Sequence, residues 1–165
     1  MKQTLEERFI AAFDEHSDAI FRFCYAQTGW RELARDLTQD TFARVWRYLI
    51  QGKSVQQMRP FLYQTARNAL IDHSRRPAAQ SLDELQETGF DVADECTPSP
   101  LVSASAAEAV RLAGALEEPY REVVLLRYVE ALMPREIAEI IGESENVVSV
   151  RITRGMQKLR ALMKI

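Results

Sequence analysis

The feature that most constrains the fold is the segment 78–105, in which apolar residues follow no regular spacing. The segment mixes acidic residues with Ser, Pro and Gly, and residues 78–110 contain seven Asp or Glu and no Lys or Arg. Such a composition buries too little apolar surface to offset the entropy lost on ordering. The sequence therefore predicts a flexible acidic linker at 78–105, with one short turn near residues 82–85, between two small domains at 1–77 and 106–165.

On both sides of this segment apolar residues recur at intervals of three and four, which is the spacing of amphipathic helices. Gly29 and Gly52 interrupt the pattern, and Pro60 and Pro77 mark the start and end of the third periodic stretch. Because β-type alternation and internal repeats are absent from the sequence, we expect an all-α chain. The expected helices lie near residues 4–28, 32–50, 59–75, 106–116, 119–130, 134–141 and 145–163.

The periodicity also predicts which side chains form the cores. The inner face of the second helix is expected to consist of Thr38, Phe42, Val45, Trp46 and Leu49. The inner face of the third is expected to consist of Leu62, Ala66, Ala69, Leu70 and His73.

Composition excludes several classes of function. No apolar run approaches the roughly 18 residues that span a bilayer, and the opening MKQTLEERF is acidic where a secretory signal would be basic, so we expect a cytoplasmic protein. The two cysteines, Cys24 and Cys96, lack CxxC spacing and have only two histidines beside them, which predicts neither a disulfide nor a metal site. Paired histidines, a nucleophile elbow and a phosphate-binding glycine loop are also absent from the sequence. We therefore expect no catalytic site, no cofactor and no small-molecule substrate.

Near the C-terminus, residues 134–160 have the layout of a helix-turn-helix. A short helix with Ile137 and Ile141 on one side meets a turn at Gly142, and Ser144 is placed to cap the longer helix that follows. One side of that helix is expected to pack through Val148, Ile152, Met156, Leu159 and Met163. The other side presents Asn146, Ser149, Val150, Thr153, Arg154 and Gln157, with Arg151 beside them. A plain αα-hairpin shares much of this pattern, so DNA recognition and a structural hairpin both stay open at this point.

Two polar helix faces stand out in the first domain. The second helix carries Asp36, Gln39, Asp40, Ala43 and Arg47 at spacings of three and four, which fits either a docking surface or an ordinary solvated face. The third helix presents Phe61, Gln64, Asn68, Ile71 and Arg75, with Arg67 and Arg76 flanking them. Aromatic, amide and Arg groups together suit unpaired bases, because rings stack on bases, amides bond base edges and cations hold phosphates.

Three strings resemble the extracytoplasmic-function (ECF) sigma factors in order and spacing: RDLTQDTFARVWRYL (35–49), MRPFLYQTARNALIDHSRRP (58–77) and LEEPYREVVLLRYVEALMPREIAEIIGES (116–144). The resemblance implies a non-catalytic subunit of RNA polymerase, with sigma region 2 as a bundle of three to four helices and sigma region 4 as a four-helix domain. Core polymerase (the β′ clamp coiled coil and the β subunit), promoter DNA and an anti-sigma factor are the implied partners.

The same resemblance assigns roles to the polar faces. Asp36, Gln39, Asp40, Trp46 and Arg47 would bind the β′ clamp. Residues 51–58 and the third helix would capture the minus 10 element, and the last helix would read the minus 35 element.

The sequence departs from the family's common pattern at NVVSV (146–150), where many members have a Gly-Thr-Val-Lys/Arg-Ser run. Ser149 replaces the usual basic base reader, and Val150 and Asn146 are the substitutes we expect to contact a thymine methyl and a base edge. The alternatives are a stand-alone helix-turn-helix regulator, which would normally have a more basic DNA face and a dimer interface, and, with less support, a helical enzyme or interaction module. Residues 1–77 carry twelve Lys or Arg against nine Asp or Glu, and residues 111–165 nine against eight. So little excess positive charge predicts weak DNA binding by the free chain.

Overall fold

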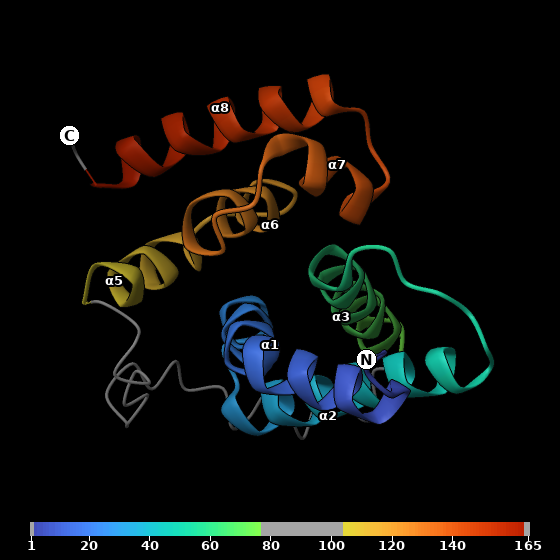
Figure 1. Ribbon diagram of the computed structural model, residues 1–165. Coiled ribbons are helices and arrows are strands. Elements are labelled where there is room, and N and C mark those ends of the chain that lie inside the picture. Colours follow the sequence, from blue (N-terminus) through green and yellow to red (C-terminus); the bar gives the residue numbers. More distant parts are fainter. Residues whose placement is uncertain (1, 77–103, 164–165) are drawn as a thin grey trace. The chain divides into compact units, whose positions relative to one another are not determined.

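The structure is a computed structural model that describes residues 2–76 and 104–163 (Figure 1). The chain divides into two compact units, the first within residues 1–90 and the second within residues 91–165. All regular structure in the described ranges is helical, so the all-α class is confirmed. The expected linker and the turn near residues 82–85 lie outside the described residues, and the predicted boundaries at 77 and 106 stay predictions.

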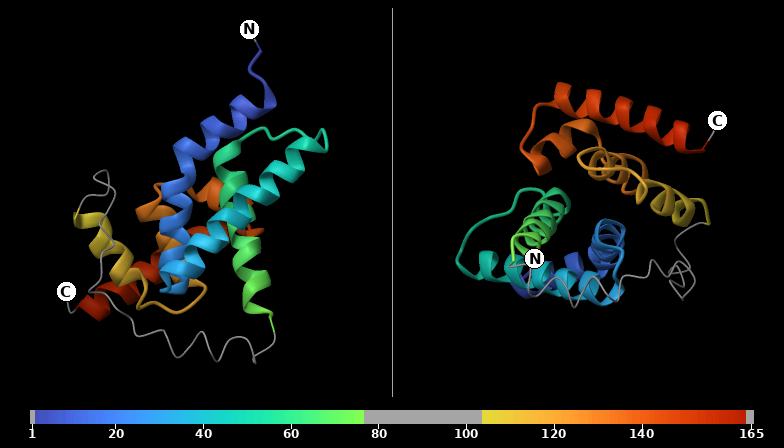
Figure 2. Two further views of the ribbon diagram at one scale, coloured as in Figure 1. Left: turned by 90° about the horizontal axis from the view of Figure 1, so that it is seen from below. Right: turned by 180° about the vertical axis from the view of Figure 1, so that it is seen from behind.

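The first unit contains α1 (Leu5–Thr28), α2 (Arg31–Ile50) and α3 (Met58–Ser74), close to the bounds expected from the sequence. A capping box begins α1, in which the Glu7 amide donates to Thr4 Oγ1 at 3.2 Å and the Thr4 amide donates to Glu7 Oε2 at 3.0 Å. Gly29 ends the helix in the left-handed conformation, with φ of 69°. The three helices cross one another, and α3 contacts both α1 and α2 (Figure 2, left).

Aromatic side chains fill much of the core of the first unit. Phe23 of α1 meets Tyr63 of α3 edge to face, with ring centroids 5.6 Å apart, and both rings are buried. Tyr63 was not among the side chains expected on the inner face of α3, whereas Leu70 and His73, which were, are only half-buried. On α2 the expected Thr38, Phe42, Val45 and Leu49 are buried, whereas Trp46 is half-buried. The prediction missed three further buried side chains of this helix: Ala34, Leu37 and Thr41.

The second unit contains α5 (Ala104–Ala113), α6 (Tyr120–Val124), α7 (Pro134–Ile141) and α8 (Glu145–Met163). One expectation was wrong here, since residues 119–130 do not form a single α-helix. After Val124 the chain continues as a π-helical segment, η1 (Leu125–Val129), which ends where the Glu130 amide donates to the Leu125 carbonyl at 3.0 Å. The wider turn keeps Leu125 and Leu126 buried, while Tyr128 stays exposed.

The longest helix of the second unit, α8, packs closely against α6. Gly155 is buried, and a Cβ added to it would lie 2.7 Å from Cγ2 of Val124. The packing stripe of α8 is therefore Val148, Ile152, Gly155 and Leu159. The expected stripe is partly wrong, because Met156 is only half-buried and Met163 is exposed.

Candidate nucleic-acid and protein interfaces

The polar face of α2 lies on the surface of the first unit. Asp36, Gln39, Ala43 and Arg47 are exposed and Asp40 is half-buried, so the structure brings these predicted residues together along one side of the helix. The Trp46 ring lies 5.0 Å from the Phe9 ring of α1. Trp46 therefore packs against α1 at the edge of this face, and only part of its side chain is exposed.

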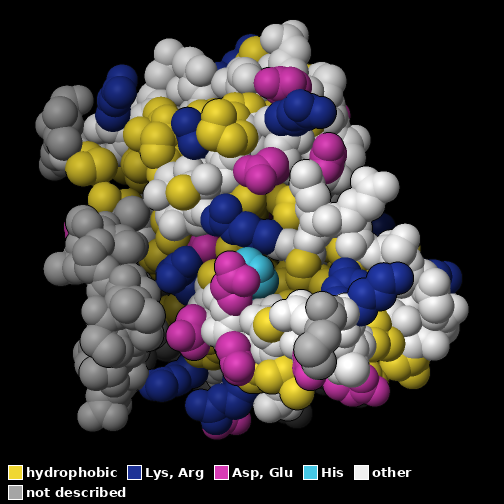
Figure 3. Space-filling view, in the orientation of Figure 1, with side chains coloured by type: hydrophobic (Ala, Val, Ile, Leu, Met, Phe, Trp, Pro, Cys, Tyr) yellow, Lys and Arg dark blue, Asp and Glu magenta, His cyan; other side chains and the backbone are white. Residues whose placement is uncertain are grey.

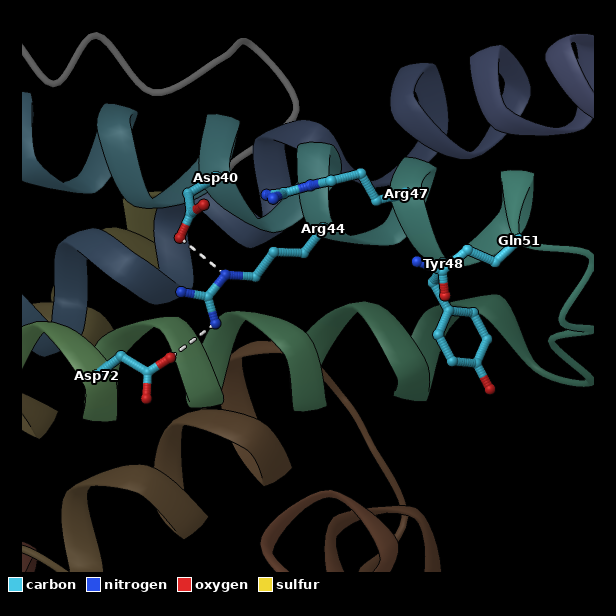
Figure 4. Close-up of a pocket in the computed structure, with 6 residues that line it drawn as sticks. All are labelled: Asp40, Arg44, Arg47, Tyr48, Gln51 and Asp72. Carbon is cyan, nitrogen blue, oxygen red and sulfur yellow. Dashed lines mark hydrogen bonds and ion pairs between the residues drawn. The ribbon is translucent and has the colours of Figure 1, made fainter.

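Arg44, which the sequence analysis did not single out, connects this face to α3 (Figure 4). Its Nε donates to Asp40 Oδ2 at 3.0 Å, and its Nη1 donates to Asp72 Oδ2 at 2.8 Å. The hydrogen bond that Arg44 donates to Asp72 is the main cause that raises the pKa of Arg44 above its ordinary value, and the charge of Asp40 acts in the same direction. An open hollow surrounds these groups and is lined further along α2 by Arg47, Tyr48 and Gln51.

The outward face of α3 is mixed in exposure. Gln64, Asn68, Arg75 and Arg76 are exposed, whereas Phe61, Arg67 and Ile71 are half-buried. The Phe61 ring packs against Tyr48 of α2 with centroids 4.9 Å apart, and Lys53 Nζ lies 5.0 Å from the centre of the Tyr48 ring. The structure thus places an aromatic and basic cluster where residues 51–58 lead into α3.

The exposed face of α8 is hollowed and has little charge at its centre. The hollow is lined by Ser149, Val150, Thr153, Arg154 and Gln157, all of them predicted site residues. Val150 is 42% exposed, and the Thr153 hydroxyl donates to the Ser149 carbonyl at 3.0 Å. Because that hydroxyl hydrogen is committed to the helix, Thr153 can offer a ligand in the hollow an acceptor but no donor while this bond is kept.

Two further predicted residues of α8 lie at the turn of the helix-turn-helix. Asn146 is exposed in the first turn of the helix, where Ser144 Oγ accepts from the Val147 amide at 3.2 Å. Arg151 is half-buried and pairs with Glu143 of the turn, with Nη2 and Oε1 3.4 Å apart. Arg151 is therefore paired with a residue of the turn, whereas Arg154 lines the hollow.

Among the described side chains in view, Lys and Arg groups lie interspersed with Asp and Glu groups on each unit (Figure 3). Burial raises the pKa of the Cys24 thiol to about 12, so the thiol stays protonated at neutral pH.

Within the ranges 2–76 and 104–163, no group of His, Cys, Asp and Glu side chains is arranged to hold a metal ion. No helix in the described part of the chain has both the length and the apolar character needed to cross a membrane.

Two family profiles match the two units in order. Residues 12–80 match Sigma-70 region 2, and residues 107–159 match Sigma-70, region 4. Both regions are characteristic of sigma factors, and the second match includes all of α7 and most of α8, the two helices of the helix-turn-helix.

Curated relatives refine this assignment. The chain is 30% identical over 169 residues to the ECF RNA polymerase sigma factor BldN of Streptomyces coelicolor, an alignment that covers 95% of this chain and 61% of BldN. It is 31% identical to SigE of Mycolicibacterium smegmatis, covering 88% of this chain and 58% of SigE. With SigM of Bacillus subtilis it shares 29% identity over 91% of each chain. The chain thus spans about three fifths of BldN and SigE, and it belongs to the ECF group of the sigma-70 family.

Solved structures have the same fold. The sigma factor RpoE, in its complex with the anti-sigma factor NepR from Bartonella quintana, matches with a TM-score of 0.76 and 20% identity over 96% of this chain and 98% of that one. CnrH, in complex with the cytosolic domain of CnrY, matches with a TM-score of 0.69 and 24% identity over 96% of this chain and 89% of that one.

Proposed function

We propose that this chain is a sigma factor that binds core RNA polymerase, directs it to specific promoters and promotes DNA opening. The observation that carries this proposal is the presence, in one chain, of both Sigma-70 regions, each with polar residues exposed on its surface. In this role the chain is a non-catalytic specificity subunit that acts in the cytoplasm beside the polymerase. A stand-alone helix-turn-helix regulator is not favoured, because it leaves the region 2 match without a role.

The face of α2 is the surface we propose for core polymerase. Asp36, Gln39, Asp40 and Arg47 present acidic, amide and basic groups that suit hydrogen bonds and ion pairs with the β′ clamp coiled coil. Trp46 supports this face through its contact with Phe9. The β subunit is the second contact with core polymerase that we propose.

The outward face of α3 is the surface we propose for the minus 10 element, through Phe61, Gln64, Arg67, Asn68, Ile71, Arg75 and Arg76. Stacking of one base on an aromatic ring contributes about 1 to 3 kcal/mol. Extruding a base from the duplex costs a few kcal/mol. Two or three such contacts therefore suffice to trap a base that the polymerase has already strained, and they do not suffice to melt duplex DNA without the enzyme.

The hollowed face of α8 is the surface we propose for the minus 35 element. Val150, which lines the hollow, suits a thymine methyl, and Arg154 and Gln157 are placed for a phosphate or a base edge. Asn146, Ser149, Arg151 and Thr153 complete the set. Arg151 must leave Glu143, or share it, in order to reach DNA.

An anti-sigma factor is the further partner that we propose. Two solved structures with a similar fold are complexes: RpoE with the anti-sigma factor NepR, and CnrH with the cytosolic domain of CnrY. The chemistry of the three polar faces does not by itself select such a partner.

Charge reversal on α2 tests the docking assignment. Asp36→Arg combined with Asp40→Arg should lower the affinity for core polymerase at least about tenfold, because two carboxylates at the proposed contact become cations. The matched control is Asp14→Arg with Asp18→Arg, which makes the same change at the same spacing on exposed positions of α1. Normal assembly of the α2 variant with core polymerase would remove the docking assignment.

A pair of asparagine substitutions tests the division between the two DNA surfaces. Asn68→Ala should slow promoter opening, followed with a fluorescent base analogue in the minus 10 element, more than it lowers initial duplex binding. Asn146→Ala, the same change on α8, should weaken initial binding and leave the opening rate of bound complexes unchanged. The same effect from both substitutions would contradict separate roles.

A further inference from the structure

Arg44 lies between the proposed docking face and the proposed minus 10 face, and the sequence analysis assigned it to neither. Asp40, its partner on α2, lies one helical turn beyond Asp36. Asp72, its partner on α3, lies one helical turn beyond Asn68. The guanidinium group therefore bonds to one carboxylate from each functional helix (Figure 4).

The geometry makes this contact responsive to a partner. One guanidinium serves two carboxylates, so each carboxylate shares its cation with the other and can exchange it for a cation of a partner. Arg47, which lines the same hollow, brings the sum of the four charges to zero. The side chains of Arg44, Asp40 and Asp72 are 33%, 40% and 57% exposed, which leaves them within reach of another protein. A partner cation that pairs with Asp40 would leave Arg44 to bond with Asp72 alone.

We propose that Arg44 is a positioning residue that couples polymerase docking on α2 to the promoter-binding face of α3. When a basic side chain of core polymerase binds Asp40, Arg44 bonds more fully to Asp72 and fixes the turn of α3 that carries Asn68. This coupling rests on the proposed function, because it needs Asp40 at the polymerase contact and Asn68 at the DNA.

A pair of mutant cycles tests the coupling. Asp40→Asn, Asp72→Asn and the double variant are prepared in the full chain, once with Arg44 and once with Arg44→Met. The readout is the rate constant of promoter opening at saturating core polymerase, so that differences in affinity for the enzyme do not enter. With Arg44 present, the effect of the double variant on the opening rate constant should differ by about threefold from the product of the two single effects. This is the size expected for partly exposed ion pairs. With Arg44→Met the two single effects should multiply.

Two results would overturn the proposal: effects that multiply in both backgrounds, or the same deviation with and without Arg44. Arg44→Lys should give an intermediate deviation, because an ammonium group lacks the planar fork that holds two carboxylates at once. Arg35→Met, at an exposed position of the same helix, is the matched control and should leave the deviation unchanged.

Thermal unfolding of each free chain separates coupling from damage to the fold. A merely structural role for Arg44 predicts opening rates that follow the melting temperatures, whereas the coupling predicts a deviation among variants that melt alike. If wild-type chain and core polymerase together open no promoter, the proposed function itself fails. If they open promoters and the cycle shows no deviation, only the coupling fails.

Discussion

The two helices proposed to contact DNA are held by different kinds of interaction. In the first unit, α3 is joined to α2 at the surface by the ion pairs of Arg44, in addition to its buried side chains. In the second unit, α8 meets α6 at Gly155, where even one added carbon would lie 2.7 Å from Val124. Ion pairs at the surface respond to salt and to charged partners, whereas close packing does not. The comparison suggests an adjustable helix in the unit that we propose opens DNA, and a fixed helix in the unit that we propose contacts duplex DNA.

The largest effect we predict tests the fixed helix. Gly155→Ala should lower the free energy of unfolding of the second unit by about 1 to 2 kcal/mol, because overpacking costs about 1 to 3 kcal/mol and replacing Gly within a helix returns up to about 1. The melting temperature of this unit should fall by roughly 4 to 8 °C per kcal/mol, as measured by circular dichroism.

The control for this substitution shortens the side chain that it meets. Val124→Ala removes Cγ2, so Gly155→Ala should cost less in the Val124→Ala background than in the wild type. Equal costs in the two backgrounds would show that the close approach of α8 and α6 is not what fixes the helix.

A smaller effect concerns the bases that α8, the fixed helix, is proposed to contact. Replacing thymine by uracil in the minus 35 element removes only a methyl group, and contact of that methyl with Val150 should contribute about 0.8 kcal/mol, or roughly fourfold in affinity. Holoenzyme binding to the two duplexes measures this. Val150→Ala should remove the preference, and a Val150→Ala holoenzyme that still prefers thymine would place the methyl elsewhere.

A substitution at Ala131 tests whether the backbone of the second unit is strained at a position away from the contact between α6 and α8. Ala131 has φ of 56°, in the left-handed region that disfavours residues with a Cβ. Ala131→Gly should therefore raise the free energy of unfolding by about 0.5 kcal/mol, the relief of strain being partly offset by the greater freedom of Gly in the unfolded chain. Urea unfolding at constant m-value measures the change, and a lower midpoint would contradict it.

The smallest effect we predict is a change in the stability of the first unit with pH. Burial is the main cause that lowers the pKa of His16, with the charge of Arg59 acting in the same direction and that of Glu15 opposing it. The unfolded chain then binds a proton more readily than the folded one, so the stability of the first unit should fall as the pH falls below about 6.5 and stay level above it. Melting curves across this range should lose the fall in His16→Gln, and a fall that persists in that variant would assign it to another group.

Local signals in the sequence predicted the helices well, because caps and the helical period depend on neighbouring residues. Thr4 and Gly29 bound α1 as expected, and Gly142 and Ser144 form the turn of the helix-turn-helix. The faces of α2, α3 and α8 follow from the same period.

The features that were missed depend on contacts between elements. The pairing of Arg44 with Asp72 joins residues on separate helices, and the place of Gly155 in the packing depends on how closely α6 approaches. The π-helical segment after Val124 has no distinct period over so few residues. Helical spacing places Gly155 on the packing face of α8 and Arg44 one turn from Asp40, but it does not show which residue of another helix each of them meets.

The central claim is that this chain supplies promoter choice and opening to an enzyme that lacks them. Transcription by purified core polymerase over a library of random promoter sequences, with and without the chain, tests it most directly. We predict that the chain produces discrete start sites preceded by two shared sequence elements, the upstream one containing thymine. Start sites that are the same with and without the chain would contradict the account.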